Sequence, residues 1–200
     1  MKRITAVLLT ILLFMTDLSV PVFADNTPTQ PYNTNCKYIS GVSNVTVWLN
    51  YASGVSIWED YITGGVNNWM YTGWDNPIYM NYVSSNIGSM MDFHAHTDLS
   101  DFDSTAYALT RLHAGDGTVV NHYTTSWWYA EIHINNSLFL MDSYSNYDAY
   151  GTIRHEMGHA FGLKHNDTNQ QSIMCTLQHG RTVNTVQLTD NSSVVSLYSY

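Results

Sequence analysis

The 200-residue sequence predicts a single α+β domain. Three observations favour this fold class. Segments in which apolar and polar residues alternate, as in half-buried strands, recur through the first two thirds of the chain. Helical patterns follow the first of these segments and come again after the last one. No internal repeat or second domain breaks this order, and the length suffices for one domain with a substantial core.

The first 24 residues have the features of a secretory signal peptide. Lys2 and Arg3 precede an apolar run over 6–15, and small residues stand just before the expected cleavage point. A membrane-spanning helix needs about 20 apolar residues, and no stretch of the chain reaches that length. We therefore expect cleavage after Ala24 and a secreted, extracellular protein without a membrane anchor. Residues 25–35 are polar and contain two prolines, which predicts a flexible leader.

A strand and a helix are expected next. Alternation of apolar and polar residues over 45–50 predicts a half-buried strand. A helix then begins at Ser53 or Gly54, because the apolar residues that follow recur at helical spacing. These residues are Val55, Trp58, Ile62, Val66 and Trp69. Gly64 and Gly65 each cost a helix about 1 kcal/mol relative to alanine, so we expect a bend or a weak middle there.

Four more strands and two helices complete the prediction. The strands are expected over 78–83, 89–96, 118–124 and 128–135. Cap-type residues over 145–148 begin a helix that carries the most informative stretch of the chain. A last helix begins at Thr189 or Asp190. Its apolar residues are Val194, Val195, Leu197 and Tyr198.

The most informative stretch is 155–165, which reads HEMGHAFGLKH. Residues four apart lie on one helix face, so His155 and His159 present two imidazoles to the same point. Gly162 can adopt positive φ and end the helix, which lets His165 approach from another direction. Three imidazoles with one open position are typical of catalytic zinc, whereas structural zinc takes four protein ligands. Glu156 lies beside this face and can reach a water on the metal.

This stretch resembles the HExxHxxGxxH signature of the metzincin metalloproteases. Met174, nine residues after His165, stands where that family has a methionine-containing turn beneath the metal, and the C-terminal residues 188–198 are most similar to the matrixin branch. The resemblance implies a catalytic domain over 36–200. It also implies a twisted, mostly parallel five-stranded sheet with one antiparallel edge strand, and three helices, one of which binds zinc.

A secreted zinc-dependent endopeptidase is the function that the resemblance implies. The substrate would be a protein or peptide bound in extended form beside an edge strand, which we expect near 118–123. Glu156 would act as the general base and His155, His159 and His165 as zinc ligands, while Met174 would be structural. Two alternatives stay open: a zinc-stabilised binding module without catalysis, and a zinc hydrolase of cell-wall or small peptides.

The chain has two cysteines, Cys36 and Cys175. In an exported protein two cysteines most simply form one disulfide, which here would tie the N-terminal region to the methionine turn. A second interpretation is a latency switch in which the Cys36 thiolate occupies the open position of the zinc, although the residues around it do not match that family's switch motif. Two bystander thiols are the third.

A second metal site is a further hypothesis. Matrixins of the vertebrate type carry a structural zinc held by three histidines and an aspartate from the region between the strands. The chain has histidines and aspartates there, namely His94, His96, Asp98, Asp101, Asp103, His113, His122 and His133. The three aspartates could instead bind Ca²⁺ through oxygen ligands. Hydrogen-bonded surface histidines and a solvated acidic turn are the competing interpretation.

The net charge of the chain excludes some classes of partner. The formal net charge is −9 at pH 7. Such an acidic protein is a poor ligand for nucleic acid or for an anionic membrane, because both repel it. We therefore expect no nucleic-acid or membrane partner. The partner implied by the resemblance is the peptide substrate, and the protein is expected to be a monomer.

Overall fold

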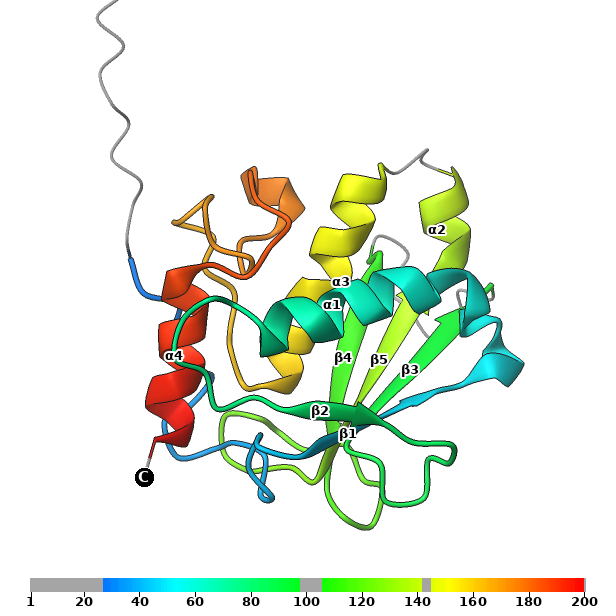
Figure 1. Cartoon of the computed structure of the whole chain (residues 1–200), viewed down its shortest axis with the longest axis horizontal. Coiled ribbons are helices and arrows are strands. Elements are labelled where there is room, and N and C mark those ends of the chain that lie inside the picture. Colours follow the sequence, from blue (N-terminus) through cyan, green and yellow to red (C-terminus); the bar gives the residue numbers. More distant parts are fainter. Residues whose placement is uncertain (1–26, 98–105, 142–144, 200) are drawn as a thin grey trace, which may run out of the picture.

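The computed structural model describes residues 27–97, 106–141 and 145–199. The predicted signal peptide over 1–24 lies outside these residues. A mixed sheet and helices packed on one of its faces make up the fold (Figure 1). The strands are β1 (Val45–Leu49), β2 (Met80–Tyr82), β3 (Met91–His96), β4 (Ala108–His113) and β5 (Tyr129–Asn135). The helices are α1 (Glu59–Met70), α2 (Asn136–Met141), α3 (Asn146–Ala160) and α4 (Leu188–Tyr198).

The order of the strands confirms the expected sheet. They run β2-β1-β3-β5-β4, with β2, β1, β3 and β5 parallel and β4 antiparallel at the edge. Successive residues of a strand point to opposite faces, so the alternating burial of Val45, Val47 and Leu49 places them toward the helices. The α+β prediction, with a mostly parallel five-stranded sheet and three long helices, is confirmed.

Helix α1 packs against α3 in front of the sheet (Figure 1). The five apolar residues predicted for its buried side are buried, although the first two lie in 3-10 turns that precede α1. The two glycines do not interrupt the helix, because α1 is continuous from residue 59 to residue 70. A Cβ on Gly64 would come within 2.7 Å of the Tyr150 ring, and one on Gly65 within 2.8 Å of the Met157 sulfur. The two glycines therefore allow α1 and α3 to approach closely.

The two helices that frame the C-terminal half begin close to their predicted positions. Ser145 caps α3, with its hydroxyl oxygen accepting the Asp148 N–H. Helix α4 begins one residue before the expected Thr189, and its first turn is closed by a capping box between Gln187 and Asp190. Among the described residues, none of the helices is long and apolar enough to cross a membrane.

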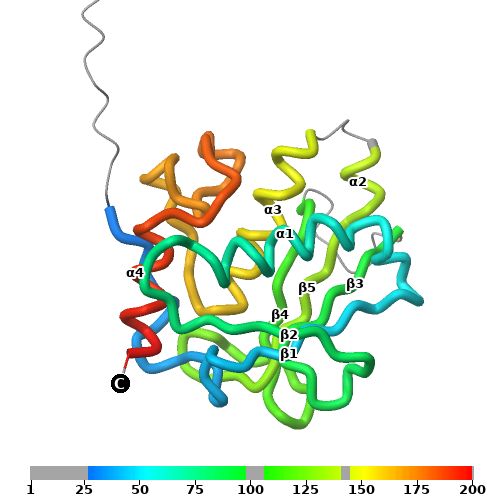
Figure 2. The backbone as a smooth tube through the Cα atoms, viewed as in Figure 1, coloured from blue at the N-terminus to red at the C-terminus, as the bar shows by residue number. Residues whose placement is uncertain are grey.

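The described part of the predicted flexible leader, residues 27–35, is packed on the domain instead. Thr29 is 1% exposed and its hydroxyl donates to Asp190 of α4. Pro31 forms a β-bridge with Leu163, and the Lys164 N–H donates to the Gln30 carbonyl. Figure 2 shows this segment running beside α4, more than 150 residues away along the chain. Composition alone predicted disorder, but these pairings with α4 and with the end of α3 overrule it.

The edge of the sheet also differs from the expectation. Residues 118–124 do not form a strand; they fold back on the end of β4 through a bridge between His113 and Val119. The edge strand is β4, whose sequence ALTRLH alternates too weakly to be recognised as a strand. The cleft edge is therefore ten residues earlier in the chain than 118–123.

Cys36 and Cys175 are both buried and both free, so the expected disulfide does not form. Each cysteine lies in its own tight turn. The Cys36 N–H donates to the Asn33 carbonyl, and the Cys175 N–H donates to the Ser172 carbonyl. The expectation rested on the general tendency of cysteines in exported proteins to form disulfides. That tendency does not tell whether two particular cysteines lie close together in the fold.

Candidate metal centre

Helix α3 and the turn after it bring three imidazoles together. His155 and His159 lie one helical turn apart, and Gly162, at φ 97°, reverses the chain so that His165 faces them. One nitrogen from each ring lies within 4.8 Å of the other two. No other triad of His, Cys, Asp or Glu within the described ranges meets this geometry. The predicted ligand set is therefore assembled.

Spacing of the nitrogens fits zinc. The Nε2 atoms of His155 and His159 are 3.1 Å apart. Two zinc–nitrogen bonds of about 2.0–2.1 Å at a tetrahedral angle would place their nitrogens roughly 3.3–3.4 Å apart. Small movements of the two imidazole rings would thus make room for the zinc ion, and imidazole nitrogens are common zinc ligands.

Hydrogen bonds to the Nδ1 atoms of His155 and His159 determine which ring nitrogen can bind a metal. The His155 Nδ1 lies 2.8 Å from the Ile173 carbonyl, and the His159 Nδ1 lies 2.7 Å from the Leu163 carbonyl. A carbonyl can only accept, so each Nδ1 carries the proton and each Nε2 keeps its lone pair. These two rings are oriented for a metal before it binds.

Burial also keeps the imidazoles neutral. It lowers the pKa of His155 well below its ordinary value and lowers the pKa of His159 to about 4. The pKa of the more exposed His165 is lowered as well, first by burial and then by the charge of His159. Neutral imidazoles are the form that binds a metal, so no proton has to be removed at neutral pH.

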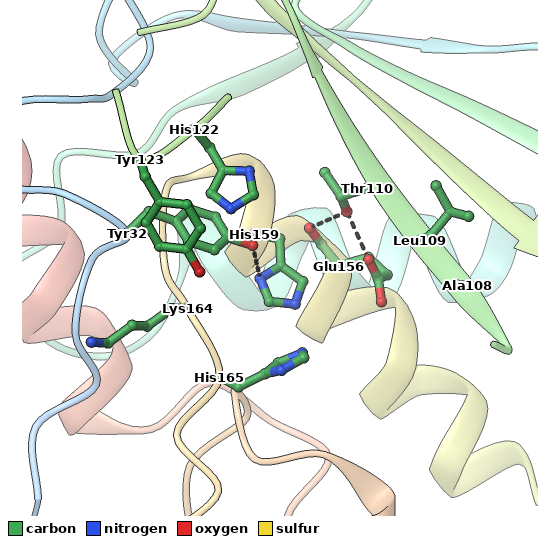
Figure 3. Close-up of a pocket in the computed structure, with 10 residues that line it drawn as sticks. All are labelled: Tyr32, Ala108, Leu109, Thr110, His122, Tyr123, Glu156, His159, Lys164 and His165. Atoms are coloured by element: carbon green, nitrogen blue, oxygen red, sulfur yellow. Dashed lines mark hydrogen bonds between the residues drawn. The ribbon is translucent and has the colours of Figure 1, made fainter. Parts of the chain in front are cut away.

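Glu156 is 6% exposed and lies beside the three histidines without belonging to the triad. Burial raises the pKa of its carboxyl to about 7, while a hydrogen bond from Thr110 acts in the opposite direction. The Thr110 hydroxyl lies 2.7 Å from Oε2 of Glu156 (Figure 3). A carboxyl group with a pKa near neutrality can both accept and return a proton.

The predicted methionine turn lies directly behind α3. Met174 is fully buried, and a Cβ on Gly158 of α3 would overlap its sulfur. The turn is held from α4, because Asp190 accepts hydrogen bonds from the Ser172 hydroxyl and from the Ile173 N–H. Since the Ile173 carbonyl orients His155, the turn supports the metal centre through hydrogen bonds.

A cavity of about 470 Å³ opens in front of the histidines (Figure 3). One wall is the edge of β4, from Ala108 to Thr110, and another is α3. Tyr32, His122 and Tyr123 form an aromatic wall, in which the Tyr32 and His122 rings are 3.9 Å apart. A peptide could enter between these walls.

Sequence reasoning missed Tyr32. It comes from the segment expected to be flexible, and its hydroxyl oxygen lies 2.7 Å from the His159 Nδ1. The His159 Nδ1 carries a proton, because it also bonds the Leu163 carbonyl. Its N–H therefore forms a bifurcated hydrogen bond that the Leu163 carbonyl and the Tyr32 oxygen both accept. Nothing in the sequence around Tyr32 indicates this role, because Tyr32 and His159 are 127 positions apart in the chain.

The residues considered for a second metal site do not all lie in one place. On the outer face of the sheet, His94, His96 and His133 lie together, with the His96 Nε2 2.9 Å from the His133 Nδ1. Glu131 links His113 to this group, because its Oε2 lies 3.2 Å from the Nε2 atoms of both His113 and His133. His122 lines the cavity at the metal centre instead. Asp98, Asp101 and Asp103 are outside the described residues. A second zinc or calcium site stays a prediction.

Comparison with known proteins agrees with this geometry. A profile of the Matrixin family matches residues 72–199, which include β2 to α4 and all three histidines. No curated protein matches the chain over its sequence. The match covers more than half of the chain, and matrixins are zinc metallopeptidases, which act on peptides. The chain therefore belongs to the matrixin family, as its histidine signature and its sheet predicted.

Proposed function

We propose that the protein is a secreted, zinc-dependent endopeptidase in which Glu156 is the general base. One observation carries the proposal: a cluster of three neutral imidazoles adjoins a cavity beside β4, and two of its members, His159 and His165, line that cavity together with the buried carboxyl group of Glu156. A structural zinc site would have a fourth protein ligand and would have no use for a carboxyl group held next to it.

The metal would be held by His155, His159 and His165. Zinc bound there would supply a Lewis acid that polarises a carbonyl and lowers the pKa of a bound water toward about 7. Glu156 accepts the proton of the attacking water and passes it to the leaving amine.

The substrate would bind as an additional strand along β4. Strand β4 pairs with β5 through alternate residues, since Tyr107 accepts a hydrogen bond from Asn135 and His113 accepts one from Trp128. The residues between them turn their N–H and C=O groups to the other edge. Leu112 already uses its carbonyl there for the Val120 N–H. Among the described residues none takes up the outward backbone groups of residues 108 and 110, so an extended peptide could pair with them.

The test is cleavage of casein by purified residues 25–200 before and after removal of zinc with a chelator. We expect cleavage to stop on chelation and to return when Zn²⁺ is added. His165→Ala should abolish cleavage and lower zinc content, whereas His179→Ala, a histidine outside the triad, should change neither.

Other results would favour the alternatives. A zinc-loaded protein that digests purified cell-wall peptides but not casein would be a hydrolase of a narrower substrate class. A zinc-loaded protein that cleaves no peptide of a broad panel would be a binding module, and the proposal would be wrong.

Secretion has its own test. Export of the full chain from an expressing cell should yield a protein in the medium whose first residue is Asp25, as the small residues before position 25 predict. N-terminal sequencing measures this directly. Retention of residues 1–24, or a protein found only inside the cell, would contradict it.

A further inference from the structure

We propose that Thr110 is a positioning residue for Glu156: its hydroxyl holds one carboxylate oxygen, so that the other faces the cavity. This inference rests on the proposed peptidase function and deepens it. Thr110 belongs to the edge strand β4, whereas Glu156 belongs to α3. The base is therefore fixed from the strand along which the substrate would bind, and not from its own helix.

The hydrogen-bond geometry ties Thr110 to Glu156 in two ways. Its Oγ1 lies 2.7 Å from Oε2 of Glu156 and 2.9 Å from the backbone carbonyl of the same residue (Figure 3). A hydroxyl has one proton, and both of these oxygens accept it. Threonine is branched at Cβ, which restricts its χ1 angle, so the backbone of β4 sets where the hydroxyl lies.

No other described side chain shares this task. Within the described ranges, Thr110 is the one side chain that hydrogen-bonds the Glu156 carboxyl group, and none of the ion pairs there includes Glu156. No described residue hydrogen-bonds Oε1, yet this oxygen is not among the polar atoms sealed from solvent. The two oxygens thus have different surroundings: Oε2 is held by β4, and Oε1 is open to the cavity, where it can accept a proton.

Removing the Thr110 hydroxyl should leave the Glu156 carboxyl group able to act as a base but no longer hold it in a fixed position. A glutamate has several rotatable bonds, and a misplacement of about 1 Å at a reacting group costs on the order of 100-fold in rate. General-base catalysis as a whole contributes about 10²–10⁴-fold, which is the upper limit of the effect.

The experiment compares Thr110→Val, which keeps the shape without the hydroxyl, with Thr110→Ser, which keeps the hydroxyl. For Thr110→Val we expect kcat to fall about 10- to 100-fold, with KM within about twofold of the wild type and zinc content unchanged. Thr110→Ser should recover kcat to within about threefold. Thr46→Val is the matched control, because Thr46 is a half-buried strand threonine outside the cavity, and it should behave as the wild type.

A second measurement does not depend on turnover. Acetohydroxamic acid chelates zinc and presents an O–H to the neighbouring base, so its affinity for the zinc-loaded protein reports on the position of the Glu156 carboxyl group. Calorimetry should show binding about tenfold weaker in Thr110→Val and near the wild-type affinity in Thr110→Ser.

Two outcomes would overturn the inference. Either Thr110→Val keeps the kcat and the hydroxamate affinity of the wild type, or Thr110→Ser loses as much as Thr110→Val, which would assign the effect to packing. An active wild type beside an unaffected Thr110→Val leaves the peptidase assignment intact. A zinc-loaded wild type that cleaves nothing refutes that assignment instead.

Discussion

Adding a methyl group at Gly158, between the first two histidines of the metal centre, should destabilise the protein. A Cβ there would overlap the Met174 sulfur and would lie 3.2 Å from the Met174 Cε and from the Trp69 ring. Met174 and Trp69 are both fully buried, and the Trp69 indole N–H is bonded to the Arg154 carbonyl. The sulfur would have to move by roughly 1 Å to reach an ordinary contact distance.

The size of the effect of Gly158→Ala follows from two opposing contributions. Alanine favours a helix over glycine by about 1 kcal/mol. Overpacking a filled core costs about 1–3 kcal/mol, and here the displaced group belongs to the turn that orients His155. The overlap with the sulfur places the overpacking cost near its upper end, at about 3 kcal/mol. We therefore expect a net loss of about 2 kcal/mol, which lowers the melting temperature by about 4–8 °C, together with weaker zinc binding.

Thermal unfolding of the zinc-loaded and zinc-free proteins measures both effects. Gly151→Ala on the same helix is the control, because its Cβ would meet mainly the end of the long Arg181 side chain, which can swing aside. It should lose less stability and keep its zinc affinity. If Gly158→Ala melts at or above the wild-type temperature with unchanged zinc affinity, the reasoning from the close packing of α3 on the methionine turn is refuted.

Three further predictions concern other parts of the molecule. Burial raises the pKa of Asp92 to about 6, so its stabilising contribution is complete below the unfolded value near 3.8 and is lost as pH rises through 6. Asp92→Asn should therefore stabilise the fold by about 1–3 kcal/mol at pH 8 but not at pH 4. Urea unfolding at both pH values tests this, and an equal difference at both would contradict it. Asp190→Ala should cost about 3–5 kcal/mol and weaken zinc binding, because it leaves buried donors of the methionine turn unpaired; unchanged urea stability would show that those bonds are unimportant. Cys36 and Cys175 should both react with a thiol reagent in denaturant without reductant; a chain with no reactive thiol would show that they pair after all.

The metal ligands were predictable because their geometry is local. Spacing along one helix fixes His155 and His159, and a single positive-φ glycine fixes the approach of His165. The same holds for the buried side of α1, where helical periodicity identified Ile62, Val66 and Trp69. Short-range geometry is what a sequence pattern records.

The remaining parts of the site depend on long-range contacts, which no pattern in this sequence reveals. Thr110 reaches Glu156 across 46 residues, from a strand with weak alternation. Tyr32 reaches His159 because the segment around it pairs with the end of α3 and with α4. Gly64 and Gly65 looked like helix breakers, but their role depends on a partner helix that is remote in the chain.

The central claim is that zinc held by three histidines and a separate general base, Glu156, together hydrolyse peptides. Its most direct test is to measure zinc content and casein turnover in parallel for the wild type and Glu156→Ala. We predict equal zinc in the two proteins and a turnover at least about 10³-fold lower in the variant, because Glu156 takes the proton and does not hold the metal. A zinc-loaded Glu156→Ala protein with turnover near that of the wild type would contradict the account.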